Sequence, residues 1–223
     1  MLQAVIGLVS MTDWEEPVDT WQALDEERSA LADDLATLDG TQWETQSLCE
    51  AWKVRHVVGH LIFGADMKAG PVFMGLIKSG MSFNRYVARE GLAIGASPPD
   101  SLLEQFRMTI GMRQIMSGAK PEILLVDLVC HSADIRRPTG LRRSVPEVTL
   151  LTVANTMKGV GFPIKTKKRI AGLRMTATDF DWSTGGGSTV EGPLASLILA
   201  MVGRRAVLND LSGDGLPAFR SRM

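Results

Sequence analysis

The stretch Glu122-Ile-Leu-Leu-Val-Asp-Leu-Val-Cys-His-Ser-Ala-Asp-Ile-Arg-Arg-Pro138 decides how the rest of the chain is interpreted. Proline is tolerated at the first turn of a helix but not in its interior, so we expect one helix that begins after Pro121 and is stopped by Pro138. Most of its first eight positions are apolar, and a helix that is apolar on nearly every side is buried. The sequence therefore predicts a central helix in a helical core.

Polar side chains interrupt this apolar helix on one side. Asp127 and His131 lie four residues apart, which places them within about 40° of each other, and Asp134 falls about 20° from Asp127. A buried carboxylate is costly unless it is paired or bound to a cation. A carboxylate and an imidazole with this spacing are typical of divalent metal sites in helical bundles. A hydrogen bond between the two within the core is the alternative.

Composition and charge narrow the class of protein. The 223 residues suffice for one large domain or two small ones, and the net charge of −1 argues against a nucleic-acid binder. Two cysteines do not make a disulfide framework, so we expect a cytoplasmic protein. Met1–Ser10 lacks the features of a signal peptide and is too short to span a bilayer, so we expect no membrane partner and an extension that is either an upstream choice of start codon or a poorly ordered tail.

The hydrophobic pattern predicts a helical part followed by a mixed part. The four bundle helices are expected at 21–38 (capped by Asp19 or Thr20), 53–67, 101–117 and 122–138, with a further helix at 72–89 between the second and the third. After Gly140 the pattern predicts a helix at 146–159, a strand at 173–180, a second strand and a turn within 181–188, and helices at 191–202 and 206–211. We therefore expect an extension at 1–18, a four-helix bundle at 19–140 and a small α+β domain at 141–223.

The second helix supplies a candidate for a third metal ligand. The chain has three histidines, and His60 lies among apolar residues of this helix, so we expect its side chain to be buried. His56 is the competing candidate, although at the helix start it could equally be a solvated or capping residue. If the second and fourth helices face each other, His60, Asp127 and His131 form a ligand set with an open coordination position, as in catalytic zinc sites.

Short motifs are spread along the chain from about Trp21: Trp43…Ser47-Leu-Cys49…Trp52-Lys-Val, His60-Leu, His131-Ser-Ala-Asp134-Ile-Arg-Arg-Pro-Thr-Gly140, Glu191-Gly-Pro, Gly203-Arg-Arg205 and Leu211-Ser-Gly-Asp-Gly215. Together they resemble the mycothiol-dependent maleylpyruvate isomerase family, which has a DinB-like four-helix bundle followed by a smaller α+β domain. In that family the fourth-helix ligand pair is usually Glu-x-x-x-His. This chain departs from the pattern, because Asp127 is one methylene shorter.

The resemblance implies thiol chemistry at a divalent metal, such as Zn²⁺. Mycothiol, the low-molecular-weight thiol of actinobacteria, would be the cosubstrate, and its metal-stabilised thiolate would attack a small electrophilic substrate. Both an isomerase and an S-transferase fit this implication, as a monomer or a homodimer. By the same resemblance Arg204 is the candidate that reaches across the domain boundary to an anionic substrate; an ordinary surface arginine is the alternative. A non-catalytic DinB-like metal- or ligand-binding protein is the competing class.

Four other residues have simpler interpretations. We expect Cys130 to be a buried apolar thiol, and Asp134 to be a partner of a ligand or a hydrogen-bond acceptor at the helix end. Arg136 and Arg137 would favour the C-terminal end of the helix dipole. Cys49 lies in the tryptophan-containing loop near the predicted site, and a functional role for it stays open.

Overall fold

The computed structural model describes residues 19–67, 75, 77–115, 120–161 and 164–223. The predicted extension at Met1–Ser10 lies outside the described residues. The first helices in chain order are α1 (Thr20–Ala36), α2 (Gly40–Trp43), α3 (Val54–Ala65), α5 (Phe83–Gly95), α6 (Pro99–Arg107) and α7 (Pro121–Thr139). They are followed by α8 (Glu147–Met157), α9 (Thr166–Arg169), β1 (Leu173–Ala177), β2 (Ser183–Gly185), β3 (Ser188–Gly192), α10 (Leu194–Met201), the 3₁₀ helix η1 (Arg205–Asp210) and α11 (Leu216–Arg220).

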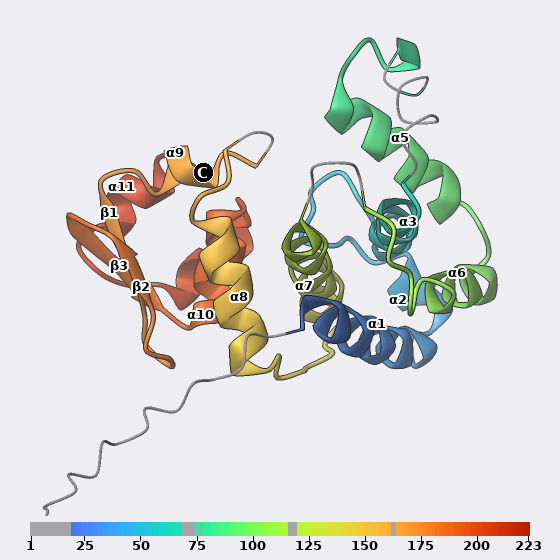
Figure 1. Ribbon diagram of the computed structural model, residues 1–223, viewed down its shortest axis with the longest axis horizontal. Coiled ribbons are helices and arrows are strands. Elements are labelled where there is room, and N and C mark those ends of the chain that lie inside the picture. The colour runs from blue at the N-terminus through green and yellow to red at the C-terminus, as the bar shows by residue number, and fades with distance from the viewer. Residues whose placement is uncertain (1–18, 68–74, 76, 116–119, 162–163) are drawn as a thin grey trace, which may run out of the picture.

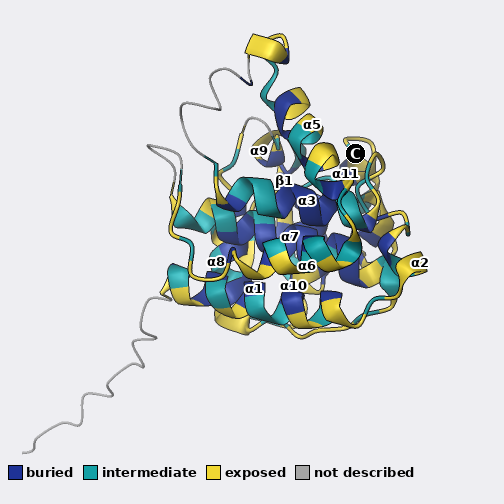
Figure 2. Ribbon diagram, turned by 90° about the vertical axis from the view of Figure 1, so that its right-hand side faces the viewer, coloured by how far each residue is buried: buried dark blue, intermediate teal, exposed yellow. Residues whose placement is uncertain are grey.

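Helices α1, α3, α6 and α7 form the bundle that holds the site. Helices α7 and α6 each pack against both α1 and α3, so each of the four contacts two of the others (Figure 1). The apolar stripe of α1 is fully buried at Leu24 and Leu31, and Leu125 of α7 is buried with it. Figure 2 shows the buried faces of α3 and α7 near the middle of the molecule. The predicted fold class, a mainly helical protein with a bundle followed by a small α+β part, is confirmed.

Helix α5 lies directly against α3 because glycines occupy the contact. A Cβ atom added to Gly59 would overlap the Gly91 carbonyl oxygen and the backbone of Gly95. A Cβ atom on Gly91 would lie 3.2 Å from the Cα and Cβ atoms of His60. The close approach of two backbones therefore supports the turn of α3 that carries His60.

The end of α7 differs from the prediction at Pro138. The helix does not stop there but continues to Thr139 and ends at Gly140, which adopts φ 78° in the left-handed region. Proline has no N–H to donate to the carbonyl four residues earlier, so the carbonyl of Asp134 is left without its helical partner. The backbone N–H of Leu48 donates to that carbonyl at 3.2 Å. Pro138 thus creates the acceptor that anchors the preceding loop to α7.

Two predicted helix ranges are wrong. The helix expected at 101–117 ends at Arg107, because the buried Arg28 side chain donates to the carbonyls of Thr109 (2.9 Å) and Met112 (3.1 Å) and holds the chain in turns. The helix expected at 72–89 is interrupted: residues 75, 77 and 78 are helical, a turn with positive φ at Gly80 and Met81 follows, and α5 begins at Phe83. Residues 72–74 and 76 of that range lie outside the described residues.

The C-terminal part packs on α7 through α8. Helix α8 contacts both α7 and α10, and α10 covers the sheet, whose strand order is β2-β1-β3 (Figure 1). Strand β1 pairs antiparallel with β2 and parallel with β3, opposing Met175 to Thr184 and Val190. Strand β3 was not predicted. Buried apolar residues of both parts join in one cluster, and a domain boundary at residue 140 stays a prediction.

Candidate metal centre

The structure brings His60, Asp127 and His131 together. Helix α3 supplies His60, and α7 supplies the other two residues from successive turns. Oδ1 of Asp127 lies 3.3 Å from Nε2 of His60 and 3.5 Å from Nε2 of His131. One potential ligand atom from each residue lies within 4.8 Å of the others. A single ion could therefore contact all three, although metal binding itself stays a prediction.

The loop between α2 and α3 covers the two imidazoles. The Trp52 ring centroid lies 5.0 Å from that of His60 and 5.9 Å from that of His131, and the two imidazole centroids are 4.6 Å apart. Each histidine side chain is only 11% exposed, whereas that of Asp127 is 36% exposed. The cluster is thus shielded by an aromatic ring on one side and accessible on the carboxylate side.

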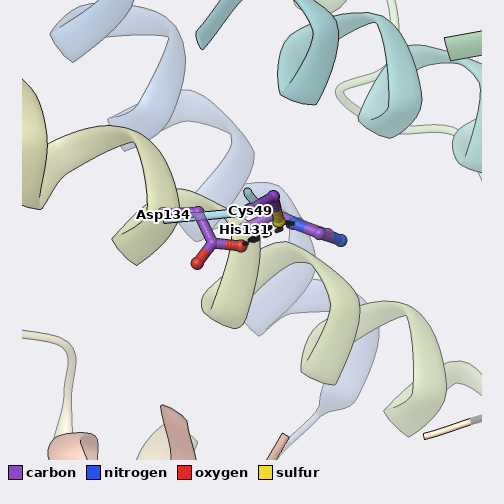
Figure 3. A group of neighbouring side chains, drawn as sticks. All are labelled: Cys49, His131 and Asp134. Atoms are coloured by element: carbon purple, nitrogen blue, oxygen red, sulfur yellow. Dashed lines mark hydrogen bonds and ion pairs between the residues drawn. The ribbon is translucent and has the colours of Figure 1, made fainter. Parts of the chain in front are cut away.

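His131 is oriented by a second carboxylate on the same helix. Its Nδ1 lies 2.8 Å from Oδ2 of Asp134, which is completely buried, and Figure 3 shows the two side chains side by side with Cys49. Because an ionised carboxylate only accepts hydrogen bonds, Nδ1 of His131 carries the proton, so that in the neutral imidazole Nε2 presents a lone pair toward Asp127. This arrangement is typical of metal-binding histidines, whose other nitrogen donates to a carboxylate.

The donor set fits a cation. With Nδ1 protonated, Nε2 of neutral His131 and the nearby Oδ1 of Asp127 are both acceptors, and two lone pairs facing each other repel. A proton or a metal ion between them would remove the repulsion. Although burial acts to raise the pKa of Asp127, the neighbouring His60 and His131 lower it to about 2, which keeps this carboxylate anionic. Two imidazoles and an anionic carboxylate are ligands suited to Zn²⁺.

Arg204 reaches this region from the C-terminal part. Its Nε donates to Oδ1 of Asp134 at 2.8 Å and its Nη2 donates to Oδ2 at 2.6 Å, a bidentate pair. Burial opposes ionisation of Asp134, but the hydrogen bonds from Arg204 and His131 hold its pKa well below the usual range. Arg204 therefore touches the residue that orients a candidate ligand, and its predicted role toward an anionic substrate stays a prediction.

A second group of potential ligands consists of Cys49, His131 and Asp134. The Cys49 thiol donates to Oδ2 of Asp134 at 3.1 Å, and Nη2 of Arg204 lies 3.0 Å from its sulfur. Burial and then the Asp134 carboxylate raise the pKa of the Cys49 thiol, against the effect of Arg204. The guanidinium already supplies a positive charge here and would repel a metal ion. We therefore assign the candidate metal site to His60, Asp127 and His131.

Two of the other sequence candidates have structural roles. His56 accepts from the backbone N–H of Lys53 at 3.3 Å, so it caps the start of α3 and does not join the cluster. Cys130 is buried, as expected. Sequence reasoning missed the stacking of Trp52 on the histidines and the contact of Cys49 with Asp134. The spacing of Trp43 and Trp52 predicted a compact loop, but it could not show what the loop covers.

Comparison with known proteins agrees with this fold. A helical bundle with a two-histidine, one-carboxylate cluster and a small α+β part is the class of protein that the structure defines. Residues 24–122 match the family model described as the mycothiol maleylpyruvate isomerase N-terminal domain, and the predicted resemblance to that family is thereby confirmed.

Two solved structures share the fold. One is a crystal structure of the mycothiol-dependent maleylpyruvate isomerase, with a TM-score of 0.60 and 17% identity. The other is a histidine-to-alanine mutant of the mycothiol-dependent maleylpyruvate isomerase, with a TM-score of 0.59 and 16% identity. Each covers 87% of this chain and 91% of its own. No curated protein matches the chain. Among the described residues, no helix is long and apolar enough to cross a membrane.

Proposed function

We propose that this protein is a metal-dependent, mycothiol-using isomerase or S-transferase that acts on a small electrophilic substrate. The observation that carries the proposal is the convergence of His60, Asp127 and His131, with one potential ligand atom from each lying within 4.8 Å of the others. The match of residues 24–122 to the isomerase family model supports the choice of thiol.

The chain's own residues would prepare a thiolate site. His60, Asp127 and His131 would hold a divalent ion such as Zn²⁺, and Asp134 would keep the Nε2 lone pair of His131 directed at it. When bound, such an ion stabilises a thiolate by lowering the pKa of the coordinated thiol. Trp52 would exclude water from one side of the imidazoles, and the exposed side of Asp127 would admit the thiol.

Arg204 is proposed to hold the anionic group of the substrate. Its Nε and Nη2 are engaged with Asp134, whereas its Nη1 has no hydrogen bond to the described residues. The ion pair with Asp134 raises the pKa of Arg204 despite its burial, so the guanidinium remains charged. Asp134 would thereby position a metal ligand and a substrate-binding cation together.

The same ion pair favours a second candidate function. Because Arg204 already has a carboxylate partner, the protein could be a non-catalytic DinB-like protein that binds a metal or another ligand. A charged pair of this kind stabilises the junction between the two parts of the chain without any substrate.

Thiol consumption separates these functions. The protein is tested in three states: as purified, after treatment with a chelator, and after Zn²⁺ is restored. Each preparation is mixed with mycothiol and a panel of electrophiles that includes maleylpyruvate. An enzyme accelerates isomerisation of maleylpyruvate or loss of thiol, loses this activity with the chelator and regains it with Zn²⁺. Stoichiometric metal without acceleration of isomerisation or of thiol loss with any electrophile would favour the binding protein. Cytoplasmic location and the absence of nucleic-acid partners remain parts of the proposal, which rest on the net charge and the two free cysteines.

A further inference from the structure

A cavity of about 230 Å³ lies on a different face of α7 from the metal centre. It is lined by α7, α8, α10 and the segment that follows α7, and it opens to solvent; these helices lie side by side in Figure 1. Arg136 lines the cavity nine residues after Asp127, which places it about 180° around the helix from that candidate ligand. Since a water molecule takes about 30 Å³ of liquid, the cavity is too large to be filled by one water.

The lining of the cavity combines an apolar wall with four arginines. Leu150 of α8 and Ile198 and Leu199 of α10 contribute to the apolar wall. The arginines are contributed by the end of α7 and the following segment: Arg136, Arg137, Arg142 and Arg143. An apolar pocket with a few convergent polar groups is the usual form of a small-molecule site.

The arginines outnumber their carboxylate partners. Asp34 accepts from Arg136 at 2.6 Å, Asp210 accepts from Arg137 at 2.8 Å, and Glu27 accepts from Arg143 at 2.9 Å. Arg142 makes no ion pair or hydrogen bond with the part of the chain that the structure describes. The cavity therefore keeps an excess positive charge.

Arg136 also has an unsatisfied donor. The residue is only 5% exposed, and its buried Nη2 has no hydrogen-bond partner among the described residues. A buried donor without an acceptor is costly, and the guanidinium cannot avoid the cost by losing its proton. The missing acceptor is an oxygen, and an anionic oxygen would balance the excess charge at the same time.

We propose that this cavity binds a small organic anion, a carboxylate attached to an alkyl or aryl group. The carboxylate lies against Arg136 and Arg142, and the apolar part of the ligand packs on Leu150 and Ile198. The site is independent of the metal centre and of the reaction proposed for it, because none of the candidate metal ligands lines the cavity.

Calorimetric titration with octanoate tests the site on the full-length protein. Octanoate should bind at one site of the protein, both when the protein is used as purified and after chelator treatment and dialysis. Octanamide, which lacks the charge, should bind more weakly. Binding that disappears with the metal would place octanoate at the metal centre and overturn the proposal, as would equal affinity for octanamide or no binding of octanoate.

Cavity-filling variants locate the bound octanoate. Ala195→Phe and Ala133→Leu add bulk from α10 and α7, which both line the cavity, and both should abolish binding. Ala218→Phe, at an exposed helical alanine outside the cavity, is the matched control and should bind as wild type. Thermal melting checks that each variant is folded. Undiminished binding in both folded cavity variants would overturn the proposal.

A charge variant tests the arginines. Arg142→Gln removes an exposed guanidinium that has no partner among the described residues, so the variant should fold normally. Its affinity for octanoate should fall about fivefold, the size expected for one exposed charge pair. Arg107→Gln, an exposed arginine of α6 outside the cavity, is its control. Equal weakening by the two variants would show a general charge effect and contradict a role for Arg142.

Discussion

The two faces of α7 place opposite kinds of charge in the interior. On one face Asp127 and His131 converge with His60, and the Asp134 carboxylate accepts a hydrogen bond from His131. Near the opposite face Arg136 is buried beside a cavity that has an excess of arginines. The first face requires a cation and the second offers donors to an anion. The difference teaches that a largely apolar helix can hold acidic and basic groups in separate surroundings when they are separated around its axis.

The neutralisation of charge also differs between the faces. Asp134 is satisfied by His131, Cys49 and Arg204, so its hydrogen bonds are saturated within the chain. Arg136 has one close carboxylate, Asp34, and one nitrogen without a partner. Asp134 thus has no hydrogen-bonding capacity left for a ligand, whereas Arg136 keeps a donor without a partner, at which the anion is proposed to bind.

The largest expected effect is the loss of metal from the histidine variants. His131→Ala should remove most of the bound metal, and the His60→Ala/His131→Ala double variant should remove all of it, because only Asp127 then remains of the three ligands. Metal content after gel filtration is the measurement. His56→Ala is the control, since His56 only caps α3, and it should keep stoichiometric metal. Stoichiometric metal in the double variant would contradict the assignment.

The Asp127 variants separate a ligand from a hydrogen-bond partner. Asp127→Asn keeps the shape but removes the anionic ligand, so metal affinity should fall clearly, whereas Asp127→Glu restores the reach usual in the family and should retain metal. If Asp127 only accepted a hydrogen bond, Asn would be tolerated and Glu would overpack the site. Chelator competition measures the metal affinity of both variants and thermal melting measures their stability, and together they show which variant is tolerated better. Wild-type affinity in Asp127→Asn would remove Asp127 from the site.

A smaller effect on metal affinity is expected from changing Asp134. Asp34, a carboxylate near the other face of α7, serves as the matched control. Asp134→Asn weakens the hold on Nδ1 of His131, and loss of such a partner typically lowers metal affinity about 10- to 100-fold. Asp34→Asn likewise weakens an arginine–carboxylate pair but touches no candidate ligand. It should lower the free energy of unfolding by about 1–3 kcal/mol and leave metal affinity unchanged. Equal metal affinities in the two folded variants would show that Asp134 has no influence on the metal.

The sequence alone predicts those features of the two faces of α7 that depend on the spacing of neighbouring residues. Spacing alone places Asp127, His131 and Asp134 on one side of α7, and apolar neighbours identify His60 as buried. The contact between Arg204 and Asp134 joins residues 70 positions apart, and only the resemblance to a family indicated that Arg204 would approach the site. The cavity was not predicted, because it depends on how α8 and α10 pack against α7.

The errors of prediction have the same origin in distant contacts. Nothing in the residues after Phe106 indicates that the buried Arg28 side chain binds their carbonyls and ends α6. Strand β3 lies between Gly187 and Pro193, which are typical of turns, and it forms because β1 offers a parallel partner. Local preference was overruled in both places by a hydrogen-bond partner far away in the chain.

The smallest effect is expected at Cys49, and it separates the two overlapping groups of potential ligands. Cys49→Ser keeps a donor for Asp134 and an acceptor for Arg204 but removes a sulfur ligand. If the metal is held by His60, Asp127 and His131, its stoichiometry should be unchanged and its affinity should change little, because the guanidinium of Arg204 already occupies the position beside the sulfur. Chelator competition on wild type, Cys49→Ser and Cys49→Ala measures this, with thermal melting as the check on folding. Cys49→Ala leaves Asp134 with one donor fewer, so it should be less stable than Cys49→Ser at equal metal content. Loss of metal from folded Cys49→Ser would instead place the ion among Cys49, His131 and Asp134. The assignment of the metal site to His60, Asp127 and His131 would then be wrong.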